Sequence, residues 1–194
     1  MNGTSRISIL LLAALIVPSL AQAHVGAGGT SGFFHGIEHP VAGLDHICAM
    51  IAVGLWAAQM GGRSIWAVPL TFITVMAFGG ILGMTGINLL FVETGIAVSV
   101  LTLGVLIAAS LRLPLVASVM IVGLFATFHG HAHGAEMPET ASGLAYAAGF
   151  VVGTAFLHAF GIGLGIAIER LASPQIGRFA GVAIVLCGGY FLLS

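Results

Sequence analysis

Long apolar runs separated by short polar breaks make up almost the whole chain. Six of these runs approach or exceed the ~20 apolar residues that a transmembrane helix needs. They lie at about residues 41–60, 65–84, 87–109, 113–130, 143–168 and 177–193. The breaks carry turn-forming residues such as Gly61, Gly86 and Pro114. Strand-like alternation is absent, so the pattern predicts an all-α, polytopic membrane bundle of six transmembrane helices rather than a β-barrel.

A shorter apolar run at the start of the chain differs from the other six. Arg6 precedes an apolar run of eleven residues, a proline follows the run, and a small-residue cleavage signal ends at Ala23. The run is too short to span a bilayer. We therefore predict that residues 1–23 are a cleaved signal peptide and that residues 24–194 form one transmembrane domain. An uncleaved first helix is the alternative.

The composition supports a membrane protein and excludes several other classes. Charged residues make up 6% of the 194-residue chain and hydrophobic residues 59%, with a mean hydropathy of +1.15. A soluble domain carries about 25% charged residues. A net charge of −1 and the absence of a basic patch argue against nucleic-acid binding. Cys48 and Cys187 lie in apolar runs and form no disulfide framework or zinc-finger pattern.

The distribution of arginine predicts the orientation of the bundle. With the mature N-terminus outside, the loops after the first, third and fifth predicted spans face the cytoplasm and hold Arg63, Arg112, Arg170 and Arg178. The opposite loops hold no Arg or Lys, which agrees with the positive-inside rule. We expect a multi-pass protein of the bacterial inner membrane with a periplasmic N-terminus.

The first cluster of polar residues precedes and enters the first long apolar run. His39 and His46 are seven residues apart, so they share a helix face if the helix begins near Pro40. Asp45 is costly in lipid and should face the bundle interior, either as a cation ligand or as an acceptor that orients an imidazole N–H. For His35, outside the span, a histidine that reaches toward interfacial water is the alternative.

The second cluster lies at the end of the fourth apolar run. In a helix, His129, His133 and Glu136 would share a face, while His131 would point elsewhere. Imidazole and carboxylate groups suit divalent nickel, cobalt or zinc, and the metalloprotease motif HExxH is missing. A histidine-rich outer loop that only concentrates metal or senses pH is the alternative.

Three isolated residues are further candidates. Glu93, about seven residues into the third run, is either an ion ligand or proton carrier, or a protonated side chain bonded to another helix. His158 should lie ~22 Å below the start of its run, too deep to join the outer cluster. It lines an inner exit path or is a satisfied core residue. After cleavage, His24 would offer its α-amine and imidazole to a late transition metal.

The two clusters resemble the paired signatures of the HupE/UreJ family of nickel and cobalt permeases. The family patterns HPxxGxDH and FHGxAHGxE match residues 39–46 and 128–136 in full. The layout of a signal peptide and six spans is also similar. The resemblance implies a role in hydrogenase or urease maturation, and it implicates His39, Asp45, His46, His129, His133 and Glu136, with a weaker match at Glu93 and Phe72.

The leading hypothesis is a permease that takes up Ni²⁺ or Co²⁺ through ligands at its outer face. It is not an enzyme and has no permanent cofactor, and it lacks the Walker A motif needed to hydrolyse ATP. Its expected partners are the metal ion and the lipid bilayer, with a cytoplasmic metallochaperone or a second copy of the chain as further candidates. The alternatives are an intramembrane zinc hydrolase, which would need three ligands and an open fourth position, and a metal-binding sensor that transports nothing.

Overall fold

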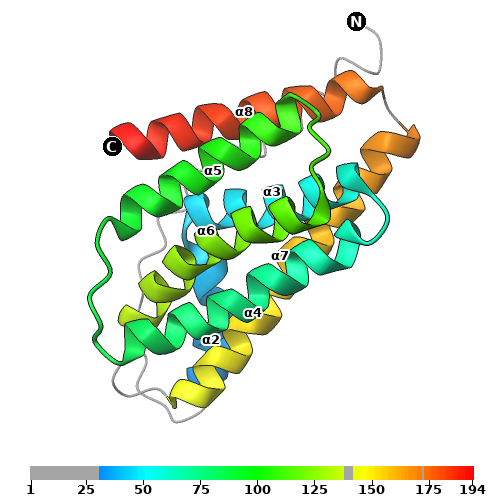
Figure 1. Ribbon diagram of the computed structural model, residues 1–194. Helices are drawn as coiled ribbons and strands as arrows, with labels where there is room; N and C mark the ends of the chain where they lie inside the picture. Colours follow the sequence, from blue (N-terminus) through cyan, green and yellow to red (C-terminus); the bar gives the residue numbers. More distant parts are fainter. Residues whose placement is uncertain (1–30, 138–141, 172) are drawn as a thin grey trace, which may run out of the picture.

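Helices form all the regular structure in the computed structural model, which describes residues 31–137, 142–171 and 173–194 (Figure 1). In chain order they are α2 (Ser31–Ala42), α3 (Leu44–Met60), α4 (Ser64–Met84), α5 (Val92–Ala108), α6 (Leu115–Ala135), α7 (Gly143–Leu171) and α8 (Pro174–Leu193). The described ranges contain no strand, so the all-α class is confirmed. The predicted signal peptide, residues 1–23, and the candidate ligand His24 lie outside the described residues.

Several of these helices are suited to crossing a bilayer. By length and composition, α4, α6, α7 and α8 each qualify as single spans. α2 and α3 qualify only as a pair, and they are bent by 84° at the break between them. α5 is apolar but has 17 residues, which is ~26 Å at 1.5 Å per residue. The described chain thus has four or five candidate spans, and the number six stays a prediction.

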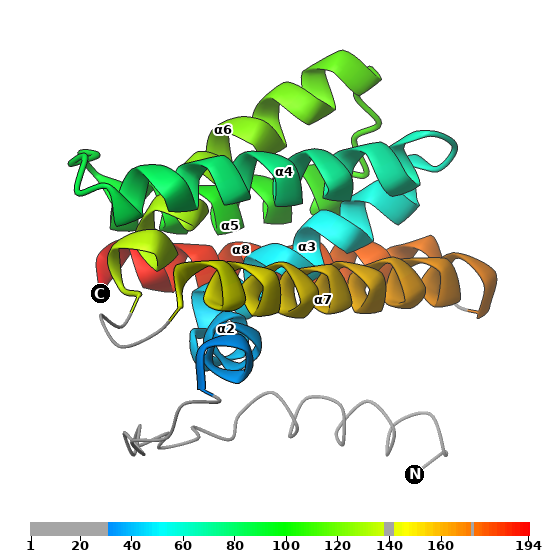
Figure 2. The same ribbon diagram turned by 90° about the horizontal axis from the view of Figure 1, so that it is seen from below.

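The bundle has two chemically different ends (Figures 1 and 2). At one end α3, α5 and α7 finish and α4, α6 and α8 begin. We call it the arginine end, because it carries Arg63, Arg112, Arg170 and Arg178. At the other, the histidine end, α3 begins and α4 and α6 finish, so both histidine motifs meet there.

The first predicted span, 41–60, is wrong at its start. α2 continues through Pro40 to Ala42, and α3 begins at Leu44 after Gly43, whose backbone is extended (φ −100°, ψ 126°). The helix break therefore falls at the glycine and not at the proline. Pro40 removes one hydrogen bond from the last turn of α2, and Gly43, the single residue between the two helices, has little preference for helix. A Cβ at Gly43 would also lie 2.6 Å from Oδ1 of Asp45.

The third and fourth predicted spans also change their limits. Residues 85–91 form turns and extended chain, and α5 begins only after Phe91, which has a left-handed backbone (φ 59°). Glu93 is therefore exposed in the first turn of α5, where a helix favours an acid, and is not seven residues deep. In contrast, α6 runs past the predicted end at residue 130 through the second histidine motif to Ala135.

Glycine allows the helices to approach closely, as the small-xxx-small pairs predict. A Cβ added at Gly130 would overlap the carbonyl oxygen of Met76, and one at Gly134 would overlap that of Gly80. α6 is therefore held against α4 by direct backbone contact. α3 and α7 meet in the same way at Gly161, and the core beside them includes the fully buried Trp56.

Candidate functional site: a file of imidazole rings

Five imidazole rings from four helices form a continuous series, which we call the imidazole file. Its members, in spatial order, are His39 on α2, His133 on α6, His46 on α3, His129 on α6 and His158 on α7. The first three steps between ring centroids measure 4.6, 4.0 and 4.7 Å. The phenyl ring of Phe72, on α4, fills the last step, 5.5 Å from His129 and 5.3 Å from His158.

The file leads from the surface of the histidine end into the core. The side chain of His39 is 28% exposed. His133 and His46 are buried, and His129 and His158 have 0% and 1% of their surface exposed. The two sequence motifs thus face each other along a series of rings that become progressively more buried toward the core.

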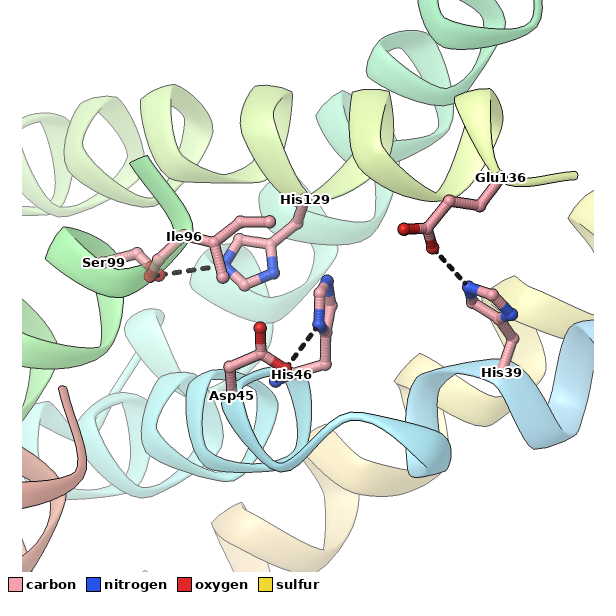
Figure 3. A network of polar contacts seen from close by, with 7 residues as sticks. All are labelled: His39, Asp45, His46, Ile96, Ser99, His129 and Glu136. Carbon is pink, nitrogen blue, oxygen red and sulfur yellow. Dashed lines mark hydrogen bonds and ion pairs between the residues drawn. The ribbon is translucent and has the colours of Figure 1, made fainter. Parts of the chain in front are cut away.

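The outer end of the file is a group of three side chains whose ligand atoms lie close enough together to hold one metal ion. Nε2 of His39 donates a hydrogen bond of 3.0 Å to Oε2 of Glu136 (Figure 3). One ligand atom each from His39, His133 and Glu136 lie within 4.8 Å of one another. The hydrogen bond from His39 lowers the pKa of the Glu136 carboxyl, so this group carries its charge at neutral pH. Two imidazoles and a carboxylate at this spacing suit a borderline divalent cation.

Asp45 fixes the protonation of His46. The carboxylate accepts hydrogen bonds from the backbone N–H of His46 at 2.8 Å and from its ring Nδ1 at 3.0 Å (Figure 3). An ionised carboxylate only accepts, so the ring proton of neutral His46 sits on Nδ1 and the lone pair on Nε2. Nε2 is buried and has no hydrogen-bond partner among the described residues. Of the two roles expected for Asp45, the geometry is that of the orienting acceptor.

Ser99 fixes the protonation of His129 in the same way. The serine hydroxyl donates its single proton to the carbonyl oxygen of Ile96 at 2.6 Å. Its oxygen must then accept from Nε2–H of His129 at 2.8 Å, which leaves the lone pair of the imidazole on Nδ1 (Figure 3). Within the described ranges Nδ1 is buried and without a partner.

His158 lies at the inner end of the file, beyond Phe72, and is not part of the outer group of His39, His133 and Glu136. Its Nδ1–H donates to the carbonyl oxygen of Met50 at 2.8 Å, and Nε2 has no partner in the part of the chain that the structure describes. A single ring, Phe72, separates it from His129. The second motif itself reaches deeper than expected, because His129 lies six residues before the end of α6, ~9 Å inside it.

The second ring of the file, His133, has neither ring nitrogen satisfied by any described residue. It lies between His39 and His46 and contacts the ring of Phe150 at 4.2 Å. An unsatisfied buried polar group costs about 1–3 kcal/mol, so a series of such nitrogens needs a functional reason. A divalent cation would accept these lone pairs. Metal-bound imidazoles usually donate their other N–H to a carboxylate, hydroxyl or carbonyl oxygen, and the rings of His46, His129 and His158 have such partners.

The remaining candidates lie outside the file. Glu93 is exposed at the start of α5, and His35 is half-buried on α2. His131 points elsewhere, as expected, and its Nε2 donates to the carbonyl oxygen of Ile87 at 2.6 Å. That bond satisfies an acceptor in the non-helical segment between α4 and α5.

Sequence reasoning missed four contributors to the site. They are Ser99, the carbonyl group of Met50, Phe150 and Tyr146, whose ring lies 5.8 Å from that of His39. Ser99 could have been identified from the sequence, because it is a hydroxyl side chain inside an apolar run. A backbone carbonyl leaves no such signal, because every residue has one.

Comparison with known proteins agrees with the two motifs. Residues 12–191 match the family described as HupE / UreJ protein. Protein HupE of Rhizobium leguminosarum bv. viciae is 46% identical over 183 residues, which cover 94% of this chain and 95% of that relative. No solved structure matches the chain. The resemblance is confirmed: this chain belongs to the HupE/UreJ family of permease-like accessory membrane proteins, which are not enzymes.

Proposed function

We propose that this protein is a permease that takes up Ni²⁺ or Co²⁺ from the histidine end and supplies it for hydrogenase or urease maturation. The observation that carries the proposal is the imidazole file. Its three oriented rings have lone pairs on Nε2 of His46, Nδ1 of His129 and Nε2 of His158, and each is buried without a partner in the described chain.

The donor set favours these ions. Imidazole and carboxylate groups bind borderline metals, and nickel stands above cobalt in the usual order of affinity. An ion that lost its water in an apolar bundle would meet a large cost, which falls when each released water is replaced by a ligand. Steps of 4.0–4.7 Å between the outer rings let the ion bind the next imidazole before it leaves the last.

The proposed topology has six spans after a cleaved signal peptide of residues 1–23. The bent pair α2–α3 forms one broken span, as in transporters whose discontinuous helices bind ions near the break. By the positive-inside rule the arginine end is cytoplasmic and the histidine end periplasmic, in the bacterial inner membrane. A membrane potential then favours entry of a divalent cation by ~4.6 kcal/mol per 100 mV.

Each predicted residue has a place in this scheme. His39 and Glu136 capture the ion with His133, and Asp45 orients His46 toward it. Phe72 separates the last two rings. Glu93 and His35 attract or relay cations outside the file, and His24 would add a terminal chelate at the same end. No permanent cofactor is needed, and a metallochaperone or a second copy remain the candidate protein partners.

Flux into vesicles that contain only this chain tests the proposal. Wild-type protein in proteoliposomes should accumulate radiolabelled nickel, and His133→Ala and Asp45→Asn should abolish accumulation while the protein still inserts. His131→Ala is the matched control, because it removes a buried imidazole of α6 that lies outside the file. A wild-type protein that binds nickel but carries none would refute the permease and favour the sensor. Competition by excess cobalt or zinc would rank the ions.

A further inference from the structure

A polar cavity of about 420 Å³ lies at the arginine end, opposite the imidazole file. It opens between α3, the α5–α6 connection, α7 and α8. Its polar lining consists of Gln59, Ser110, Arg112, Glu169 and Arg178. None of these residues belongs to the histidine motifs, and the proposed uptake site gives them no role.

The hydrogen bonds in the cavity use N–H groups of Gln59 and Arg178 as donors, and they leave the side-chain oxygen of Gln59 without a partner among the described residues. The side-chain amide of Gln59 donates to the carbonyl oxygen of Ile107 at 3.2 Å and to Oγ of Ser110 at 3.3 Å. Arg178 also donates to Oγ of Ser110, at 3.3 Å. Oε1 of Gln59 is buried and has no hydrogen-bond partner within the described residues. Gln59 thus lines the cavity and carries an acceptor that no described residue uses.

The second oxygen group is the carboxylate of Glu169, and the guanidinium group of Arg112 lies beside it. Oε1 of Glu169 lies 3.9 Å from a terminal nitrogen of Arg112, and both side chains are largely open to solvent. Such an exposed pair contributes little to stability, typically about 0–1 kcal/mol. It can therefore open at small cost when another cation reaches the carboxylate.

The cavity approaches the inner end of the file along two helices. On α3, five residues separate Met50, whose carbonyl group binds His158, from Leu55 in the cavity wall, which is ~8 Å. On α7, seven residues separate His158 from Gly165, which is ~10 Å. Between His158 and the cavity, α3 and α7 pack without a gap, because their backbones are in contact at Gly54 and Gly161.

We propose that this cavity is the release site for the divalent cation, an inference that rests on the proposed uptake function. Oε1 of Gln59 and the carboxylate of Glu169 receive the ion after His158, and Arg112 competes with it for Glu169. Oxygen ligands hold Ni²⁺ and Co²⁺ less tightly than imidazoles do, and conduction needs sites that an ion can leave. The path therefore runs from nitrogen ligands at entry to oxygen ligands with a tethered competing cation at exit.

The test measures initial rates of nickel uptake into proteoliposomes for wild type, Glu169→Gln, Glu169→Asp and Arg112→Gln. Loss of the release carboxylate in Glu169→Gln should lower the maximal rate about tenfold, the usual scale for a lost metal-site group, with little change in KM. Glu169→Asp keeps the charge and should restore most of the rate. Arg112→Gln removes the competing cation, so it should slow release and increase the nickel retained by the purified protein. Arg170→Gln is the matched control, since it removes a charge at the same end outside the cavity.

The outcomes separate this proposal from the uptake function. A wild type that carries nickel, together with Glu169→Gln and Arg112→Gln variants that behave like Arg170→Gln, overturns the release site and leaves the file intact. Equal loss in Glu169→Gln and Glu169→Asp, or a rise in KM without a fall in maximal rate, also overturns it. If the wild-type protein carries no nickel, the proposed uptake function itself is wrong.

Discussion

Replacing Ser99 by alanine tests whether the file depends on oriented imidazoles or only on the presence of histidine. Ser99 does not reach the metal-facing nitrogen of His129. It accepts the proton on the opposite side of the ring, at 2.8 Å, while its own proton is held by the carbonyl oxygen of Ile96. Ser99→Ala therefore leaves all five rings in place and removes only the group that keeps the lone pair on Nδ1.

The expected size of the effect follows from burial. Ser99 and His129 are both 0% exposed, so no water can readily replace the lost acceptor. Either the ring N–H stays unpaired, or the proton moves to Nδ1 and blocks the ligand position. Leaving a buried donor unpaired costs about 1–3 kcal/mol, and one or two kcal/mol corresponds to a factor of about 5–30 in an equilibrium constant. We expect nickel affinity, read as KM for uptake, to weaken by that factor.

The assay compares uptake kinetics and nickel binding for three variants. Ser99→Thr retains a hydroxyl that can make both bonds and should stay close to wild type. Ser118→Ala is the matched control, because this serine is equally buried but bonds Pro114 and Met60 near the arginine end. If Ser99→Ala bound and carried nickel as well as Ser118→Ala does, the tautomer of His129 would not matter. The argument from oriented lone pairs would then be refuted.

Three other predictions concern packing, pH and the inner end of the file. Gly134→Ala should destabilise the protein by about 1–3 kcal/mol in a thermal unfolding assay, because the added methyl meets α4, whereas Gly163→Ala, at an open position of α7, should not. Uptake should fall as the pH is lowered, because protonated imidazoles cannot bind metal. The pKa of Glu136 is lowered by its hydrogen bond with His39, so its carboxylate stays charged to lower pH than a free glutamate, and Glu136→Gln should weaken nickel uptake throughout the neutral range. His158→Gln should reduce the maximal uptake rate about tenfold with little change in KM, since the ion meets this ring last.

Hydropathy predicted which segments of the chain form helices but not the residues at which some of these helices begin. The predicted runs 65–84 and 143–168 closely match α4 and α7. The errors fall at the bend before α3 and at the late start of α5, where the backbone of Gly43 is extended and that of Phe91 is left-handed. Both segments are apolar enough to lie in a bilayer, so average hydropathy cannot distinguish them from helix.

The residues of the candidate site were predictable, but their order in space was not. The spacing of His129, His133 and Glu136 placed them on one helical face, because α6 continues through the motif. The sequence offered no reason to place His46 between His129 and His133, since this depends on the bend at Gly43. The depth of His158 relative to Phe72 likewise depends on which turns of α4 and α7 face each other.

The glycines of the second motif explain how α6 is held in register with α4. Gly130 and Gly134 each follow a ligand histidine by one residue, so they face about 100° away from the rings around α6. That side of α6 rests on the backbone of α4, whose carbonyl groups leave no room for a Cβ. Since lipid gives helices little hydrophobic reason to associate, this backbone contact must hold α6 in place while its opposite side presents imidazoles to α3. The spacing of the motif therefore meets two requirements at once, and substitution of either glycine should disturb nickel affinity as well as stability.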